Sequence, residues 1–212
     1  ALVGCVKDDD VEIVGQDVPN AQELPIEIGE VFKVSTIGDS RFISHGGAIL
    51  RKAIEKNSEK DLLFVGSMED KYGYSHDAKG GDNSQDLMDR YYDIPDADLY
   101  VIMFGTNDGS NWSNENTLTF LISDKLSQGK KVYYCKQTPR YDGGDNQHVL
   151  QDAFMINYFQ GVEGFEVVDL RTPMFNEDGD INDDLYHDHV HPNNDGTKVM
   201  GREIANKIDE TN

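Results

Sequence analysis

Apolar residues recur along this chain with two periods, one typical of β-strands and one typical of α-helices. Short apolar runs rich in β-branched and aromatic residues, which predict strands, occur at residues 29–37, 62–66, 99–104, 131–135 and 165–170. Apolar residues at helical spacing follow these runs, at residues 44–56, 84–94, 118–126, 149–159 and 195–208. Because strands and helices alternate, the pattern predicts a parallel sheet of five strands with helices on both faces.

Two stretches follow neither period. Residues 1–28 are acidic and are interrupted by Pro19 and Pro25, so we expect an irregular lead-in before a single domain at residues 29–212. The polar stretch at residues 67–81 predicts a long loop. With 212 residues and 37% hydrophobic content, the chain can bury one sizeable core.

The net charge is strongly negative, at −21 from 40 acidic and 19 basic residues. This charge opposes binding to phosphate backbones, so we expect no nucleic-acid partner. It is compatible with a solvated acidic surface and also with a salty or extracellular habitat. The sequence contains no apolar run of about eighteen residues, so no membrane span is expected.

The two cysteines, Cys5 and Cys135, are too few for a disulfide framework, and their spacing does not suit a metal site. One disulfide and two unpaired thiols both remain open. Leu2-Val3-Gly4-Cys5 resembles the lipobox of bacterial lipoprotein precursors, although no charged and hydrophobic region precedes it. This resemblance favours a secreted or cell-envelope location over a cytoplasmic one. The sequence does not indicate an oligomeric state.

The first apolar run ends in Gly38-Asp39-Ser40, directly before a helical segment. Open α/β proteins bind ligands at the carboxyl ends of their strands, which is where this serine is expected. A serine hydroxyl becomes a strong nucleophile only when a base takes its proton and a third group orients that base. The alternative is that Ser40 only forms a turn or caps the next helix.

The chain supplies partners for such a serine. Asp188 and His191 lie shortly before the last predicted helix. Gly81 and Asn107 lie in two polar segments, one of which follows a strand directly, where they could donate hydrogen bonds to a developing oxyanion.

These motifs together resemble the SGNH hydrolases, also called GDSL esterases and lipases, over nearly the whole chain after residue 30. Four short blocks occur in the order of that family, namely Gly38-Asp39-Ser40, Gly81, Gly105-Thr106-Asn107-Asp108, and Asp188 with His191. The resemblance implies a three-layer α/β/α sandwich of the flavodoxin-like type with a five-stranded parallel sheet. It also implies an enzyme without a cofactor or a metal.

Carried over to this sequence, the resemblance makes Ser40 the nucleophile, His191 the base and Asp188 the residue that orients it. The oxyanion hole would consist of the backbone N–H groups of Ser40 and Gly81 and the side-chain amide of Asn107. The remaining block residues, which would support these groups, are Gly38, Asp39, Gly105 and Asp108. One departure is that Arg41 follows the serine, where the family usually has an aliphatic residue.

The histidine-rich segment allows two other interpretations. Asp184 and His187 also have the Asp-x-x-His spacing, but only His191 is followed by Pro-Asn and a helix. His187, His189 and His191 alternate, so an extended backbone would place all three imidazoles on one face, as a zinc site requires. A metal-dependent hydrolase is therefore an alternative, although it leaves the Gly-Asp-Ser and Gly-Thr-Asn-Asp blocks unexplained.

We predict a serine esterase that releases short acyl groups such as acetate from small-molecule or carbohydrate esters. The loops around the expected site are polar and rich in glycine, whereas a long-chain lipase should have a broad apolar lining. The candidate substrate-binding residues are Arg41, Tyr74, Trp112 and Tyr141. A thioesterase or lysophospholipase using the same triad and a carbohydrate-binding module without catalytic activity are the alternatives.

Overall fold

The computed structural model describes residues 31–43, 48–109 and 115–211. The expected lead-in at residues 1–28 lies outside these residues. The strand at the centre of the sheet is β1 (Phe32–Gly38), which pairs in parallel with β5 (Leu99–Met103). The sheet continues in parallel through β6 (Lys131–Cys135) to β7 (Phe165–Val168).

On its other side β1 has two partners in succession. Its first half pairs in parallel with β2 (Leu62–Phe64), and its last residues pair in parallel with β4 (Ser75–Ala78). A short antiparallel strand, β3 (Met68–Glu69), completes the sheet beside β4. The described sheet therefore has seven strands, so the predicted parallel α/β sheet is confirmed and the predicted number of five is too low.

The missed strands lie in the stretch at residues 67–81 that was predicted to be a loop. Within this stretch, the buried strand β4 carries the polar residue Asp77, whose hydrogen bonds are satisfied inside the fold. One carboxylate oxygen of Asp77 accepts a hydrogen bond from the Ser35 hydroxyl at 2.9 Å, and the other accepts from Ser67. A buried strand that satisfies its polar groups in this way lacks the apolar pattern that reveals strands in a sequence.

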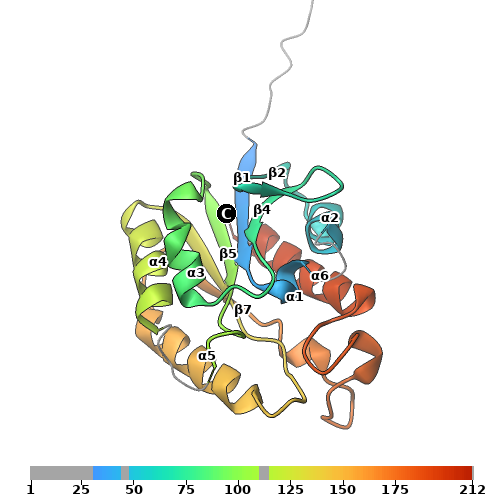
Figure 1. Ribbon diagram of the computed structural model, residues 1–212. Coiled ribbons are helices and arrows are strands. Elements are labelled where there is room, and N and C mark those ends of the chain that lie inside the picture. Colours follow the sequence, from blue (N-terminus) through green and yellow to red (C-terminus); the bar gives the residue numbers. More distant parts are fainter. Residues whose placement is uncertain (1–30, 44–47, 110–114, 212) are drawn as a thin grey trace, which may run out of the picture.

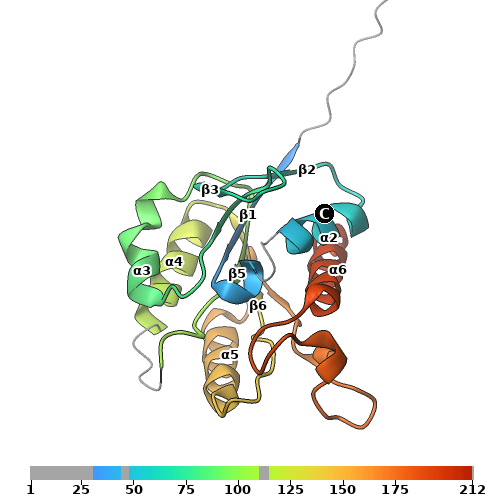
Figure 2. The ribbon, with the colours of Figure 1, turned by 45° about the vertical axis from the view of Figure 1, so that its right-hand side comes forward.

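Helices cover both faces of the sheet, which gives the three-layer α/β/α sandwich (Figures 1 and 2). One layer contains α2 (Ala48–Asn57) and α6 (Asn194–Glu210), and the other contains α3 (Ser84–Asp89), α4 (Glu115–Ser127) and α5 (Asp145–Phe159). The short elements are α1 (Ser40–Ile43) and the 3₁₀ turns η2 (Tyr91–Asp93), η3 (Thr172–Met174) and η4 (Asp183–Leu185).

Strand β5, which lies between β1 and β6, shows how the sequence builds this core. Leu99, Val101 and Met103 face the layer of α2 and α6, whereas Tyr100 and Ile102 face the other layer, and all five are buried. A strand buried on both faces has a continuous apolar sequence, as parallel sheets require. Among the described helices, none is long and apolar enough to cross a membrane.

Candidate active site

Ser40 lies at the carboxyl end of the central strand. β1 ends at Gly38, and Ser40 begins the short helix α1 with its side chain half-buried. Gly38 has to be a glycine because a Cβ atom there would lie 2.7 Å from the ring of Phe42, which packs over the turn. The turn therefore presents Ser40 at the edge of the sheet, as the sequence predicts.

A hydrogen-bonded chain of three side chains starts at this serine. The Oγ of Ser40 lies 2.8 Å from Nε2 of His191, and Nδ1 of His191 lies 2.8 Å from the nearer carboxylate oxygen of Asp188. Because an ionised carboxylate only accepts hydrogen bonds, Nδ1 of a neutral imidazole carries the proton. Nε2 is then the acceptor that faces the serine hydroxyl.

Asp188 is held in its ionised form. Burial alone would raise its pKa, but hydrogen bonds from the backbone N–H groups of His191 and Val190 and from the imidazole lower the pKa to about 2. Both backbone N–H groups bond the same oxygen, Oδ1, at 2.8 Å. The orientation of the carboxylate is therefore fixed by the backbone of its own loop.

The loop that carries Asp188 and His191 is fixed at both ends. The residues before and after it, Tyr186 and Pro192, form an isolated antiparallel bridge. The hydroxyl of Tyr186 donates to the carbonyl of Pro139 at 2.7 Å. Asn193 caps α6 by accepting hydrogen bonds from two backbone N–H groups of its first turn. The imidazole is thus carried by a closed loop that leads directly into a capped helix.

Gly81 and Asn107 lie in loops that are bonded to each other and to the serine turn. The backbone N–H of Lys79 donates to the carbonyl of Gly38 at 3.0 Å, so the glycine loop starts beside the turn. Gly81 has a φ of +82°, a conformation that favours glycine. The side-chain amide of Asn107 donates to the carbonyl of Asp82 at 2.9 Å, and its second N–H has no hydrogen bond to any residue that the structure describes.

The other block residues support these loops. The carboxylate of Asp39 accepts hydrogen bonds from the backbone N–H groups of Arg41 at 3.0 Å and Thr106 at 3.4 Å. Gly105 has a φ of +126° at the point where the chain leaves β5. A carboxylate oxygen of Asp108 accepts from the backbone N–H of Ser84 at 2.8 Å. The nucleophile, glycine and asparagine blocks are therefore joined by hydrogen bonds.

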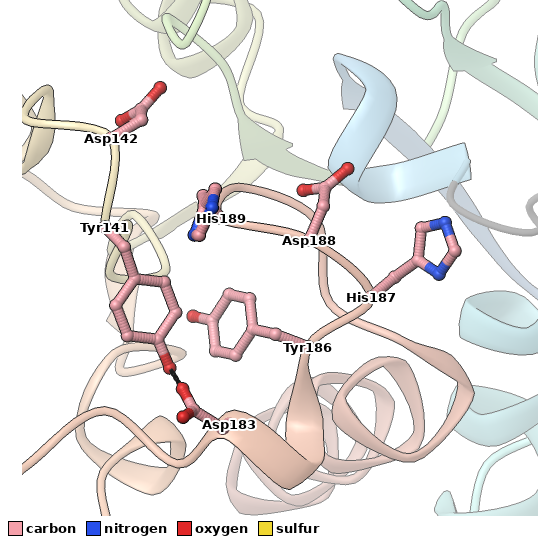
Figure 3. Close-up of a pocket in the computed structure, with 7 residues that line it drawn as sticks. All are labelled: Tyr141, Asp142, Asp183, Tyr186, His187, Asp188 and His189. Carbon is pink, nitrogen blue, oxygen red and sulfur yellow. Dashed lines mark hydrogen bonds between the residues drawn. The ribbon is translucent and has the colours of Figure 1, made fainter.

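The three alternating histidines do not converge. His191 faces Ser40, whereas the ring of His189 packs against the ring of Tyr141, with 6.0 Å between centroids. Figure 3 shows His187 and His189 directed to opposite sides of the loop that carries Asp188. Among the described residues, no group of three or more His, Cys, Asp or Glu is arranged to hold a metal ion. The loop is a closed hairpin rather than an extended strand, which explains why the alternation predicted the wrong geometry.

Two of the candidate substrate-binding residues, Arg41 and Tyr74, have contacts that the structure defines. The side chain of Arg41 is fully buried and bonded to Asp39, so it faces neither substrate nor solvent. Tyr74 stacks edge to face on Phe64 and donates its hydroxyl to Glu55 of α2. The prediction for Arg41 was wrong because its buried acceptor, Asp39, could not be identified in the sequence. The substrate-binding role of Tyr74, which is partly exposed, stays a prediction.

The other two candidates have different outcomes. Trp112 lies outside the described residues. Tyr141 lies beside the loop of Asp188, where its hydroxyl bonds Asp183 and its ring contacts Tyr186 at 5.7 Å between centroids. Cys135 is a free, buried thiol, and Cys5 also lies outside the described residues.

A cavity of about 660 Å³ lies beside Asp188 (Figure 3). Its lining combines two tyrosine rings with carboxylates and imidazoles, from Tyr141, Asp142, Asp183, Tyr186, His187, Asp188 and His189. Such a lining offers hydrogen-bonding groups and aromatic faces rather than a broad apolar surface.

Sequence reasoning missed a second group of polar residues beneath the site. Gln137, His148 and Asp152 are buried, and they bond the ends of strands β5 and β6. Burial together with the charges of Arg41 and Arg140 lowers the pKa of His148 to about 3, so this imidazole is neutral. The available sequence signal was the polar run that follows Cys135 at the end of a strand.

The fold and the site define an α/β protein with its polar centre at the carboxyl edge of a parallel sheet. A family model described as the GDSL-like lipase/acylhydrolase family matches residues 64–199, and the chain belongs to this family. The protein is therefore an enzyme of the esterase class. The matched range includes Gly81, Asn107, Asp188 and His191 and begins after Ser40. A search of curated protein sequences gave no match.

Solved structures with the same fold include two carbohydrate esterases. A family 3 carbohydrate esterase from Clostridium thermocellum is 17% identical, with a TM-score of 0.69 over 85% of this chain and 97% of that one. A carbohydrate esterase of family 3 from Talaromyces cellulolyticus is 19% identical, with a TM-score of 0.64 and coverage of 85% and 97%. A member of the lipolytic protein G-D-S-L family from Veillonella parvula is 19% identical, with a TM-score of 0.65 and coverage of 86% and 100%. At these identities the likeness shows a shared fold.

Proposed function

We propose that the protein is a serine esterase that cleaves short acyl esters, such as acetyl groups, from hydroxylated small molecules or carbohydrates. The observation that carries this proposal is the continuous hydrogen-bonded chain from Ser40 through His191 to Asp188. Its two links have the lengths and the donor order that a serine nucleophile with a general base requires.

In the first half of the reaction, the Oγ of Ser40 attacks the ester carbonyl carbon while its proton moves to Nε2 of His191. The resulting imidazolium is stabilised by the negative charge of Asp188. The bond between the acyl carbon and the alcohol oxygen then breaks, and the alcohol leaves with the proton from Nε2. Ser40 now carries the acyl group.

In the second half, water attacks the acyl carbon and gives its proton to Nε2 of His191. The bond to Oγ of Ser40 breaks, the acid is released, and the proton returns to the serine. Each attack creates an oxyanion, for which the backbone N–H groups of Ser40 and Gly81 and the side-chain amide of Asn107 are the proposed donors.

The negative charge around the triad supports a neutral, hydroxylated alcohol part of the substrate, and the cavity that carries part of this charge shares Asp188 with the triad. Carboxylates line the cavity, and the whole chain carries a net charge of −21. This charge disfavours the phosphate groups of coenzyme A thioesters and of lysophospholipids. Tyr141, which is 38% exposed, offers a ring on which a sugar could stack. The carbohydrate esterases with the same fold point to the same substrate class.

The test is a panel of p-nitrophenyl esters from acetate to palmitate together with acetylated sugars. We expect the highest activity on acetyl esters, loss of nearly all activity in Ser40→Ala, and labelling by a fluorophosphonate at Ser40. Ser127→Ala is the matched control, since Ser127 lies on α4 and its hydroxyl bonds only its own helix among the described residues. More than a few per cent of wild-type activity in folded Ser40→Ala would disprove the role of Ser40. A preference for palmitate would disprove the acyl-length assignment.

A further inference from the structure

Arg41 is a buried cation directly beneath the nucleophile turn. Its side chain and that of Asp39 are both fully buried. The guanidinium bonds both carboxylate oxygens of Asp39, with Nε at 3.0 Å and Nη2 at 2.9 Å. Burial would raise the pKa of Asp39, but the charge of Arg41 and the hydrogen bonds from Arg41 and Thr106 lower it. This pair is therefore a bidentate ion pair one residue away from Ser40 on either side.

The same guanidinium connects the turn to the end of strand β5. Nη2 of Arg41 donates to Oε1 of Gln137 at 2.5 Å, and Nε2 of Gln137 donates to the carbonyl of Phe104 at 3.0 Å. Phe104 is the residue directly before the asparagine block. Gln137 is itself held through its backbone N–H, which donates to the carboxylate of Asp152 at 3.0 Å. Arg41 thus lies between two of the loops that form the proposed site.

Thr106, the residue before Asn107, is held from two sides, by Asp39 and by the buried His148. Its backbone N–H donates to Asp39 at 3.4 Å, and its hydroxyl lies 3.4 Å from Nε2 of the buried His148. The contact to Asp39 connects the backbone next to Asn107 to the ion pair, in addition to the hydrogen bond that Asn107 itself donates to the carbonyl of Asp82. The carbonyl of Phe104 also accepts from Nε2 of Gln151 at 2.6 Å, and that of Thr106 accepts from Nη1 of Arg140 at 3.4 Å. A shift of the guanidinium would therefore act on residues 104–106 through Asp39 and Gln137, against these other contacts.

We propose that Arg41 is a positioning residue that sets the asparagine loop relative to Ser40, so that the amide of Asn107 faces the developing oxyanion. This inference rests on the proposed function, because it assigns Arg41 a role in the same reaction. Misplacement of a reacting group by about 1 Å can reduce a rate about 100-fold. The effect belongs in kcat rather than in KM, since the oxyanion exists only in the transition state.

Arg51 is a matched control within the same chain. It is also a fully buried arginine, with Nε 3.2 Å from the carboxylate of Asp70 and Nη1 3.2 Å from the hydroxyl of Thr36. These two partners belong to β1 and to the β3–β4 turn, away from the asparagine loop. Arg41→Lys and Arg51→Lys therefore each replace one buried guanidinium by an ammonium, and only the first touches the proposed site.

The experiment compares kcat and KM for p-nitrophenyl acetate, the melting temperature, and amide hydrogen exchange of a peptide spanning residues 104–109. Arg41→Lys should lower kcat about 10- to 100-fold with KM within about twofold, and it should speed exchange in this peptide. Arg51→Lys should lower the melting temperature by about as much as Arg41→Lys does, while its kcat stays within about twofold of the wild-type value. Equal losses of kcat in the two variants, or an unchanged kcat in Arg41→Lys, would overturn the inference.

A second variant covers the case in which Arg41→Lys does not fold. Gln137→Met has nearly the same shape and leaves the Asp39 ion pair intact, and it should also lower kcat at constant KM. An unchanged kcat in folded Gln137→Met would then refute the positioning role. If the wild type hydrolyses no ester, the proposed function fails, and the exchange measurement alone decides whether Arg41 orders residues 104–109.

Discussion

The carboxylate of Asp188 can be replaced in two ways that should have different effects on the same imidazole. In Asp188→Asn, the side-chain oxygen is expected to stay at the Oδ1 position, because two backbone N–H groups donate to it there at 2.8 Å each. The new NH₂ group then occupies the Oδ2 position, 2.8 Å from Nδ1 of His191. Since an amide nitrogen only donates, Nδ1 must become the acceptor and the proton must move to Nε2.

That tautomer cannot act as the base for Ser40, because Nε2 would donate to the serine oxygen instead of accepting its proton. In a serine protease triad, the corresponding change of Asp to Asn lowers kcat about 10⁴-fold. We expect a loss of the same order here, equivalent to about 5.4 kcal/mol of activation free energy. Asp188→Ala should be less harmful, because the side chain is 46% exposed and water can accept the Nδ1 proton without forcing the tautomer.

The assay is kcat/KM for p-nitrophenyl acetate in wild type, Asp188→Asn and Asp188→Ala, with the ¹⁵N spectrum of the imidazole as a direct readout of the tautomer. Circular dichroism controls for folding. The alanine variant should be at least about tenfold more active than the asparagine variant. If Asp188→Asn keeps more than a tenth of wild-type activity, or if alanine is the worse substitution, the backbone does not control the orientation of residue 188 and the argument fails.

Two further predictions follow from the same structure. His191→Ala should lower kcat by orders of magnitude with KM little changed. His187→Ala should have a mild effect on kcat, because it changes an exposed side chain on the other side of the loop from His189. The reverse result would move the triad to Asp184 and His187. Burial raises the pKa of Asp152 to about 7, so the folded state keeps a proton that the unfolded chain releases near pH 3.9, and stability should fall as the pH rises from about 4 to 7. Asp152→Asn should remove this loss of stability, which is on the order of 4 kcal/mol. Denaturant unfolding of both proteins between about pH 4 and 7 measures it. If the assignment is wrong, the unfolding free energies of the two proteins will change with pH in parallel.

The parallel sheet and its helices could be predicted because their apolar patterns are strong. All five predicted apolar runs form strands, and β5 has the most continuous pattern because both of its faces are buried. The order of the short blocks along the chain also placed Ser40 and His191 at one edge of the sheet, since the carboxyl ends of parallel strands meet there. Their partnership across 151 residues is a consequence of topology rather than of any local signal.

The buried polar contacts could not be predicted, because a sequence shows that a residue is polar but not that a partner inside the fold will satisfy its hydrogen bonds. Asp77 in β4 made a strand look like a loop, since its acceptors are filled by Ser35 and Ser67 only once the chain has folded. Arg41 shows the same effect at the site. A lone arginine beside a nucleophile suggests a substrate contact or a solvated side chain, and neither reading includes the carboxylate two residues before it. In the Asp39-Ser40-Arg41 turn, the two charged side chains flank the serine and form an ion pair with each other. Arg41, the residue that departs from the family pattern, is therefore held inside the protein, and of these three residues only Ser40 remains partly exposed.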